Sequence, residues 1–338
     1  MGIDITLSII IPCYNGENHL MRCLNSLLNQ DVPLDSYEII IVDDGSTDGT
    51  PEICDLYSSK YLNISVISQS NGGIGAARNA GIRQAKGKYM MFVDADDYVD
   101  HNVLSILTNK IINSNLQALR FNYQSLDENL QIIPKKNNST FSVVWDEISV
   151  DGTEFLTEKL GWSCYVWLYI FDTYLIRKNN LYFSEGVIFE DIDWLVRVLL
   201  VTQKIMAIDK QVYNYVQRVN SITQDSTLEN KSNIVKDKIR VVNFLIELSQ
   251  KTKNVKVELW CKGMISLTFM GILSFTENEF PERKNEIIRL LRRKKLLPLK
   301  SYHFTWKQKR DLSIINISPK IFCFIKRRVK INILSLNN

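Results

Sequence analysis

The chain has 338 residues, of which 45% are hydrophobic and 23% charged, and its formal net charge is +4. These proportions are those of an ordinary globular protein, and they exclude disordered and collagen-like classes. The length predicts one large domain with an appendage. We find no apolar run long enough to span a bilayer and no signal peptide, which predicts a cytoplasmic protein. Six scattered cysteines without a Cys-x-x-Cys pair predict reduced thiols, and they argue against a disulfide framework or a zinc site.

The charge is distributed unevenly along the chain. Residues 282–338 contain 16 Lys and Arg against 3 Asp and Glu, a local charge of +13, which leaves −9 for residues 1–281. A basic tail on an acidic body is typical of a protein that meets an anionic surface.

Strand and helix patterns alternate over the first 100 residues. Such alternation specifies an α/β fold with a mostly parallel sheet covered by helices. From residue 227 onward the apolar spacing is helical and no catalytic motif occurs. The predicted strands cover residues 6–11, 37–42, 64–67 and 89–93, and the predicted helices cover residues 17–29, 47–59 and 71–85.

Three carboxylates directly follow the fourth predicted strand, in the segment 92–97 (Phe-Val-Asp-Ala-Asp-Asp). A strand that ends in this way brings acidic groups to the carboxyl edge of the sheet, where open α/β folds bind ligands. Clustered carboxylates repel one another unless a cation neutralises them, and Mg²⁺ or Mn²⁺ prefer such oxygen ligands. The alternative is a solvated acidic turn that caps the next helix.

Other unusual residues also follow strands. Tyr14, Asp44 and Asn71 each come after one, so we expect them to gather at the same edge as Asp94. Their structural alternatives are ordinary turns with an adjacent helix cap. The glycines of segment 71–75 are superficially similar to a dinucleotide fingerprint, but they occupy the third strand–helix turn instead of the first. Glycines that open a helix still suit the close approach of a phosphate.

Four blocks in this order closely resemble the nucleotide-sugar domain of glycosyltransferase family 2. The resemblance covers about residues 5–100, and a looser similarity continues to about residue 225. It implies a GT-A fold, a Rossmann-like sheet covered by helices, and the inverting transfer of a sugar from a nucleotide sugar. The blocks are Ile-Ile-Pro-Cys-Tyr-Asn from residue 10, Val-Asp-Asp-Gly-Ser-Thr-Asp-Gly-Thr from 42, Asn-Gly-Gly-Ile-Gly-Ala-Ala-Arg-Asn-Ala-Gly-Ile from 71, and Phe-Val-Asp-Ala-Asp-Asp from 92.

The resemblance also divides the chain. Residues 1–225 would form the GT-A catalytic domain, with a nucleotide-sugar-binding half at 5–100 and an acceptor-side half at 101–225. Residues 226–338 would form a helical, basic C-terminal region.

For the nucleoside of the donor, the resemblance assigns roles to four residues. Tyr14 would stack on the uracil, Pro12 would line the same pocket, and Glu17 would lie near the ribose. Asp44 would accept a hydrogen bond from the uracil imide, and a carboxylate suits this role because it only accepts.

For the diphosphate and the metal, the resemblance assigns five more residues. Asn71 and Arg78 would hold the nucleotide and its diphosphate, the arginine through a bidentate fork. Asp94 would lie towards the ribose and the metal, and Asp96 would bind the Mn²⁺ or Mg²⁺ that bridges the diphosphate. Asp97 would lie near the metal and the acceptor. The metal would neutralise the charge that builds on the leaving nucleoside diphosphate.

An aromatic-rich stretch leads to a Glu-Asp pair at residues 190 and 191, which resembles the acceptor-side segment of the family. Inversion by a single displacement requires a base on the acceptor hydroxyl. We assign Asp191 as this base and Glu190 as the residue that orients it or raises its basicity, with Asp193 as the rival base. The structural alternative is a helix N-terminus, where acidic residues favour the dipole.

A second segment, Tyr-x-Tyr-x-x-Arg from residue 213, resembles the end of the family's catalytic domain. Arg218 would reach the diphosphate when a loop closes over the donor. The alternative is a surface arginine on an edge strand. Some family members have a histidine near this position as a further metal ligand, and this chain has none.

The C-terminal segment pairs aromatic residues with a basic cluster at residues 321–330, after a basic amphipathic stretch at 287–297. Such segments bind anionic lipid headgroups. We therefore expect a peripheral protein at the inner face of the cell membrane, with a solvated basic helix bundle as the alternative.

The prediction as a whole is a metal-dependent inverting glycosyltransferase. It would move a sugar from a UDP-sugar to a glycan or lipid-linked acceptor in cell-surface polysaccharide synthesis, and it would not bind nucleic acid. One alternative is a sugar nucleotidyltransferase, which the first strand–helix turn disfavours because it lacks a Gly-rich basic loop. The other is a non-catalytic glycan-binding scaffold, which the retained carboxylates disfavour.

Overall fold

The computed structural model describes residues 5–134, 143–218 and 227–326. The chain divides into two compact units. The first, here called the sheet unit, comprises residues 1–136 and 143–221, and the second, the helical unit, comprises residues 137–142 and 222–338. The predicted domain boundary at residues 225 and 226 lies outside the described residues. All the predicted site residues belong to the sheet unit.

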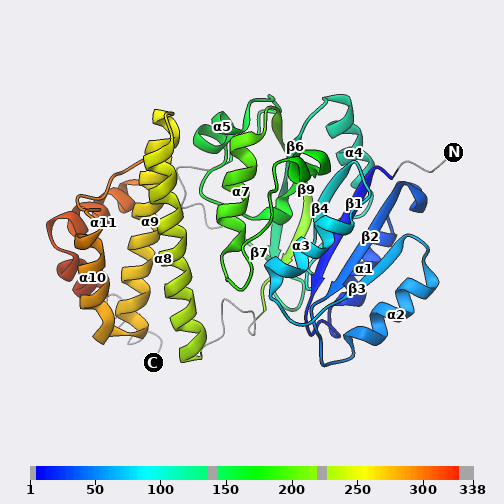
Figure 1. Ribbon diagram of the computed structural model, residues 1–338, viewed down its shortest axis with the longest axis horizontal. Helices are drawn as coiled ribbons and strands as arrows, with labels where there is room; N and C mark the ends of the chain where they lie inside the picture. Colours follow the sequence, from blue (N-terminus) through cyan, green and yellow to red (C-terminus); the bar gives the residue numbers. More distant parts are fainter. Residues whose placement is uncertain (1–4, 135–142, 219–226, 327–338) are drawn as a thin grey trace. The chain divides into compact units, whose positions relative to one another are not determined.

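Among the described residues, nine strands form one sheet in the sheet unit (Figure 1). Their order is β3-β2-β1-β4-β8-β6-β9-β5, and β7 pairs with β6. The strands are β1 (Leu7–Cys13), β2 (Tyr37–Asp43), β3 (Ile64–Ser68), β4 (Tyr89–Phe92), β5 (Tyr98–Val99), β6 (Ala118–Leu126), β7 (Ile132–Ile133), β8 (Tyr169–Asp172) and β9 (Ile205–Val216).

The first four strands form the predicted parallel sheet. β1 pairs in parallel with both β2 and β4, so that Ile10 lies between Ile40 and Phe92. β3 continues the parallel pairing on the far side of β2. β1, β2 and β4 are buried along their whole length, which is why they are continuous apolar runs in the sequence.

The second half of the sheet is mixed, so the sheet as a whole is less parallel than expected. β8 is antiparallel to both β4 and β6, while β6 is parallel to β9. β9 pairs with β5 on its other side, so this strand is not an edge of the sheet. The alternating strand–helix pattern that predicted parallel pairing stops at about residue 100, and the later strands other than β7 pair across long connections.

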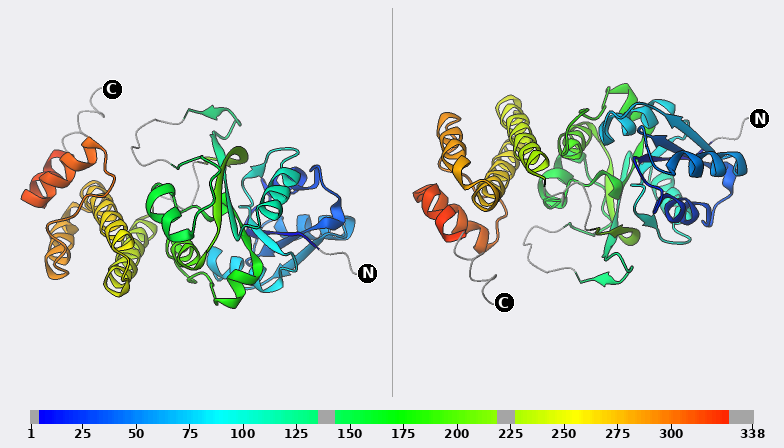
Figure 2. Two further views of the ribbon diagram at one scale, coloured as in Figure 1. Left: turned by 90° about the horizontal axis from the view of Figure 1, so that it is seen from above. Right: turned by 90° about the horizontal axis from the view of Figure 1, so that it is seen from below.

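Helices lie against both faces of the sheet (Figure 2). Helix α3 packs so closely on β1 that a Cβ atom on Gly81 would lie 2.3 Å from Cγ2 of Ile10. The helices of this unit are α1 (Leu20–Leu28), α2 (Thr50–Lys60), α3 (Ile74–Gln84), α4 (Leu104–Asn113), α5 (Gly152–Glu154), α6 (Thr173–Lys178) and α7 (Glu190–Val201), with short turns η1 (Leu34–Ser36), η2 (Phe155–Lys159) and η3 (Val166–Leu168).

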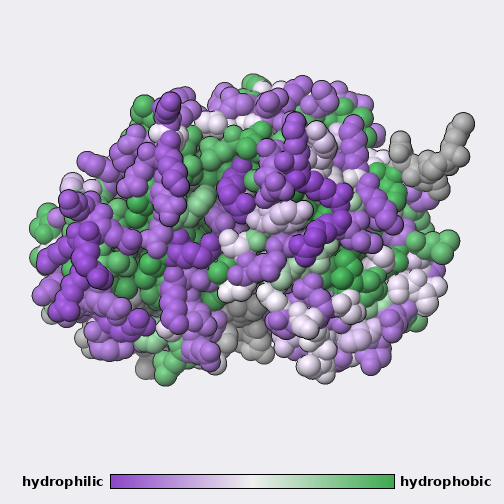
Figure 3. All heavy atoms as spheres, in the orientation of Figure 1, coloured by the Kyte–Doolittle hydropathy of each residue, from purple (hydrophilic) through white to green (hydrophobic). Residues whose placement is uncertain are grey.

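The helical unit is built around α9, whose buried residues include Trp260, Phe269 and Leu273. In the view of Figure 3, hydrophilic side chains cover the exposed sides of α8 and α10. The helices are α8 (Leu228–Lys251), α9 (Val255–Glu279), α10 (Lys284–Arg293) and α11 (Trp306–Ile317), with the turn η4 (Pro281–Arg283).

Helix α9 is long and apolar enough to cross a membrane by length and composition. The prediction that the chain contains no apolar stretch of membrane-spanning length is therefore wrong for α9. Of the window that meets the criterion, 61% is buried inside the structure. A buried helix at the centre of a bundle meets the same criterion, because its neighbours shield its apolar surface.

Candidate functional site

The loops after β1 and β2 are joined at the carboxyl edge of the sheet. Glu17 accepts a hydrogen bond from the backbone amide of Gly49 at 2.8 Å, and Asn15 accepts one from Thr47 at the same distance. Tyr14 is half exposed on this edge, whereas Pro12 is buried within β1. The structure thus brings the residues predicted for the nucleoside to one edge, where Tyr14 and Glu17 are exposed.

Asp44 holds the glycine loop that precedes α3. One carboxylate oxygen accepts hydrogen bonds from the amide of Gly72 at 3.0 Å and from the side chain of Gln69 at 2.7 Å, and the other accepts from the amide of Gly73 at 2.8 Å. Gly73 has φ of +84°, a conformation that favours glycine. Both oxygens therefore have donors within the chain. The uracil-binding role of Asp44 remains a prediction. The role of its exposed neighbour Asn71, which is to hold the nucleotide and its diphosphate, also remains a prediction.

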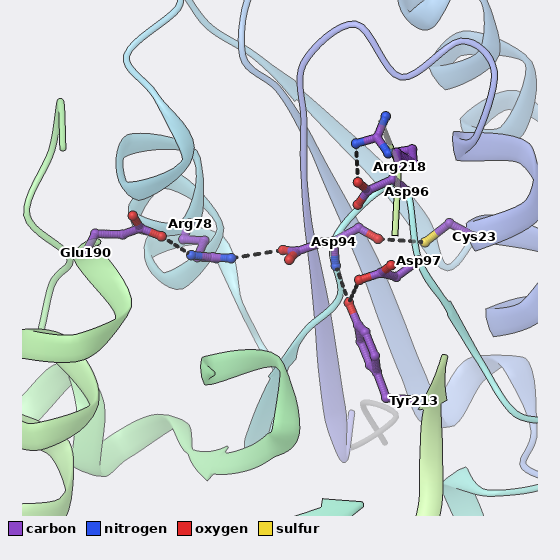
Figure 4. Close-up of polar contacts among 8 residues, drawn as sticks. All are labelled: Cys23, Arg78, Asp94, Asp96, Asp97, Glu190, Tyr213 and Arg218. Atoms are coloured by element: carbon purple, nitrogen blue, oxygen red, sulfur yellow. Dashed lines mark hydrogen bonds and ion pairs between the residues drawn. The ribbon is translucent and has the colours of Figure 1, made fainter. Parts of the chain in front are cut away.

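A buried arginine joins the two halves of the site (Figure 4). Arg78, on α3, pairs through Nη1 with Glu190 at 2.5 Å and through Nη2 with Asp94 at 2.9 Å. Burial alone would lower the pKa of Arg78, but the charges of Asp94, Glu190 and Asp191 together raise it. The arginine is therefore charged. It fixes the start of α7 relative to the three carboxylates Asp94, Asp96 and Asp97, here called the acidic motif.

Asp96 lies between two arginines. Its carboxylate forms an ion pair with Arg218, which follows β9, and its carbonyl oxygen accepts a hydrogen bond from Arg22 of α1 at 2.6 Å. The Asp96 side chain remains 26% exposed, and Nε of each arginine is buried with no hydrogen-bond partner among the residues that the structure describes. Arg218 thus lies inside the site, and not on an edge strand as in the structural alternative.

Asp97 is buried and held by β9. Tyr213 donates its hydroxyl to one oxygen of Asp97 at 2.8 Å, and the amide of Val216 donates to the other at 2.8 Å. The same hydroxyl accepts a hydrogen bond from the amide of Asp94. Burial, then the charges of Asp96 and Asp94, raise the pKa of Asp97 well above its usual range. Asp97 therefore ties the acidic motif to the sheet and has little contact with solvent.

Glu190 and Asp191 occupy the first turn of α7, as the structural alternative expected. Glu190, however, points to Arg78 and pairs with it. Asp191 is half-buried, and burial, followed by the charge of Glu190, raises its pKa to about 8. A carboxyl group with this pKa accepts a proton readily near neutral pH. Asp193 is more deeply buried, accepts a hydrogen bond from Ser184 and pairs with Arg197.

Comparison with known proteins fits this arrangement. Residues 8–158 match the family model described as Glycosyl transferase family 2. The chain is 30% identical over 252 residues to the uncharacterized glycosyltransferase YibD of Escherichia coli K12, an alignment that covers 72% of this chain and 71% of YibD. The chain belongs to glycosyltransferase family 2.

Some relatives are longer than this chain. This family 2 chain is 30% identical over 228 residues to glycosyltransferase GlyA of Streptococcus pneumoniae serotype 4, an alignment that covers 66% of the chain but only 32% of GlyA. Among solved structures, the crystal structure of S. aureus TarS 1-349 superposes with a TM-score of 0.59 and 22% identity, covering 83% of each chain. The fold is therefore the predicted GT-A fold.

The acidic motif fits a divalent cation through one or two carboxylates. Among the described parts of the chain no group of three or more His, Cys, Asp and Glu side chains has the arrangement of a metal site. Asp96 is accessible, and Asp94 uses one oxygen for Arg78. This donor set suits Mg²⁺ or Mn²⁺, which commonly take one or two carboxylates together with substrate phosphates. A cation at Asp96 would compete with the guanidinium of Arg218 for the same carboxylate.

The sequence analysis missed two residues of this site. Tyr213 holds both Asp94 and Asp97, and Arg22 holds the backbone of Asp96. Tyr213 is the first residue of the Tyr-x-Tyr-x-x-Arg segment, in which only Arg218 received a predicted role. The segment itself is recognisable in the sequence, but the role of Tyr213 is not. Nothing in the local sequence marks Arg22, because its contact is with a residue 74 positions away.

We predict that Arg78→Met destabilises the protein by about 3–5 kcal/mol, because it leaves Glu190 and Asp94 buried without their countercharge. Urea denaturation followed by circular dichroism measures the change. Adding Glu190→Gln to Arg78→Met should restore part of the loss. Arg83→Met on the exposed side of the same helix is the control and should change stability by less than about 0.5 kcal/mol. Equal effects of the two single variants would contradict a structural role for the buried pair.

Proposed function

We propose that this chain is a metal-dependent inverting glycosyltransferase that transfers a sugar from a UDP-sugar to a hydroxyl of a glycan or lipid-linked acceptor in cell-surface polysaccharide synthesis. The observation that carries this proposal is Asp191, a half-buried carboxyl group with a raised pKa beside a charged pair that reaches the acidic motif. Asp191 removes the proton from the acceptor hydroxyl as that oxygen attacks the anomeric carbon of the sugar and the bond from this carbon to the UDP oxygen breaks. Arg78 holds Glu190 in an ion pair next to this base.

The donor and metal assignments draw support from relatives. TarS 1-349 has been crystallised in complex with UDP-GlcNAc and with UDP, and GalNAc-T7 with UDP, GalNAc and Mn²⁺. In this chain Asp96 and Asp94 would hold the cation, which when bound supplies positive charge to the leaving diphosphate. Arg218 pairs with the carboxylate of Asp96 and Arg22 bonds its carbonyl oxygen. Within the described residues the Nε atoms of both arginines have no partner, and they would hold phosphate oxygens. Tyr14 would stack on the uracil.

We predict a rising pH profile that depends on Asp191. Because the base must be deprotonated, kcat/KM should increase with pH and level off above about 8. Asp191→Asn should lower kcat by about 10²–10⁴-fold while UDP binding is retained. Steady-state kinetics from pH 5.5 to 9.5 with a UDP-sugar and glycan acceptors measure both. Asp193→Asn is the matched control and should keep the rising profile. If Asp193→Asn abolishes transfer and Asp191→Asn does not, the base has been assigned wrongly.

The same pKa predicts an effect on stability. A carboxyl group whose pKa is raised by folding binds its proton more tightly in the folded state than in the unfolded state. Its ionisation therefore lowers the stability of the folded state, increasingly so as pH rises from about 4 to about 8. Asp191→Asn should therefore increase the melting temperature, by at least about 2 °C at pH 8 and less at pH 5. Thermal denaturation at the two pH values measures the difference, and a lower melting temperature at pH 8 would contradict it.

We predict that Asp96→Asn abolishes Mn²⁺-dependent UDP binding. Calorimetric titration of UDP, GDP and dTDP, each with and without Mn²⁺, tests the wild type, Asp96→Asn and the control Asp55→Asn on the exposed side of α2. The wild type and the control should bind UDP more tightly when Mn²⁺ is present. If the wild type binds no nucleotide under any of these conditions, the transferase proposal fails and the glycan-binding scaffold takes its place.

We further propose that the helical unit binds the inner face of the cell membrane. A surface hollow of about 490 Å³ is lined by Glu286, Arg289, Arg292 and Arg293 of α10, so its lining carries a net positive charge. On and after α11, Trp306 and Ile317 are 73% and 81% exposed, and Ile321 and Phe324 are about half exposed. Basic side chains beside exposed aromatic and aliphatic ones suit the membrane interface. The rest of the predicted basic cluster, from residue 327, lies outside the described residues.

We predict that the chain sediments with vesicles that contain phosphatidylglycerol. Each basic residue contributes about 1 kcal/mol near an anionic surface, so replacing Arg289, Arg292 and Arg293 by alanine should weaken binding by about 100-fold. The control replaces Lys251, Lys253 and Lys256, which are exposed at the end of α8, in the following turn and at the start of α9, and should bind as the wild type does. Equal losses in the two triple variants would contradict a specific basic site.

A further inference from the structure

Four aromatic side chains of the acceptor-side half form a continuous stack inside the sheet unit. Trp167 stacks on Tyr213, with ring centroids 4.3 Å apart, and on Tyr165, with ring centroids 5.0 Å apart. Tyr215 lies 5.6 Å from Trp167, also parallel. Offset parallel rings at these separations attract one another beyond their burial alone. The stack is therefore a rigid element.

Tyr123 fixes the stack from the side. Its ring meets Trp167 edge to face at 5.2 Å and Tyr165 at 6.4 Å. Trp167 and Tyr213 are buried, whereas Tyr165 at the outer end of the stack is 41% exposed. A large aromatic side chain that is packed on one side and open on the other is a preformed contact surface that loses little conformational entropy on binding.

The two ends of this stack lie at the two chemical centres of the site. At the inner end, the Tyr213 hydroxyl is bonded to Asp97 and to the amide of Asp94. At the outer end, the pKa of the Tyr165 phenol is raised to about 12, mainly by burial and by the neighbouring tyrosines. The charge of Asp191 also contributes to this shift, so the two side chains interact electrostatically. An acceptor lying on Tyr165 would therefore lie within the range over which the charge of the proposed base acts.

We propose that Tyr165 is the platform for a pyranose ring of the acceptor, which holds the attacking hydroxyl beside Asp191. This inference rests on the proposed function and narrows the acceptor to a ring-shaped sugar. A pyranose has a flat face of C–H groups that covers an aromatic ring, and its hydroxyls remain free for polar neighbours such as Asp191. An open-chain polyol phosphate, the acceptor class in the name of the relative TarS, a poly(ribitol-phosphate) transferase, has no such face.

Saturation-transfer NMR tests the platform with cellobiose, lactose and methyl hexopyranosides against ribitol 5-phosphate. The full chain is used in the presence of UDP and Mg²⁺, which avoids the line broadening of Mn²⁺. We expect at least one pyranoside to bind through the C–H protons of one ring face, and ribitol 5-phosphate to bind more weakly. Tyr165→Phe should retain this binding, and Tyr165→Ala should weaken it by at least about tenfold, or about 1.4 kcal/mol.

Controls separate the platform from the fold and from the donor site. Tyr174→Ala removes an exposed tyrosine of α6 and should bind pyranosides as the wild type does. In Tyr165→Ala, UDP affinity and melting temperature should stay close to the wild type, because only the outer ring of the stack is lost. If Tyr165→Ala binds pyranosides normally, or if the wild type binds UDP but prefers ribitol 5-phosphate, the platform is refuted while the transferase proposal stands. If the wild type does not bind UDP, the proposed function itself fails.

Discussion

The structure of the site depends on one buried charge. Arg78 lies on α3, is almost completely removed from solvent, and must therefore find its countercharges within the protein. It finds them in Asp94, at the end of β4, and in Glu190, at the start of α7, so one guanidinium joins the predicted donor half to the predicted acceptor half. Because Asp191 is the next residue of α7, the same pairing sets where the proposed base lies. Within the described residues, Oε2 of Glu190 and Nε of Arg78 are buried without hydrogen-bond partners.

Each of the three carboxylates of the acidic motif has its own partner within the protein. Asp94 pairs with Arg78, Asp96 with Arg218, and Asp97 with the hydroxyl of Tyr213 and the amide of Val216. These partners offset only part of the mutual repulsion, which still raises the pKa of Asp97, and the three groups differ in accessibility. Asp97 is enclosed and structural, while Asp96 remains open and is neutralised by a side chain that a cation could displace. The arrangement favours Asp96 as the point where a metal and a diphosphate would meet.

The sequence by itself determined the first half of the sheet unit and the order of its motifs. Apolar runs separated by helical spacing are local properties, so residues 1–100 could be read as alternating strands and helices, and their parallel pairing follows from that alternation. The positions of Tyr14, Asp44 and Asp94 at one edge follow in turn, since carboxyl ends of parallel strands meet there. The four blocks that resemble family 2 also predicted the GT-A fold correctly.

Only the tertiary structure decided the pairing of side chains that are distant in the sequence. The sequence could not show that Arg78 meets Glu190 across 112 positions, that Tyr213 holds Asp97 across 116, or that Arg22 reaches Asp96. It also could not show that β8 lies antiparallel between β4 and β6, because strand order after residue 100 is set by packing and not by local pattern. The raised pKa of Asp191 has the same origin: burial and the neighbouring charge of Glu190 exist only once α7 is packed against the rest of the site. Residue types were enough to propose a base, but its environment is a property of the fold.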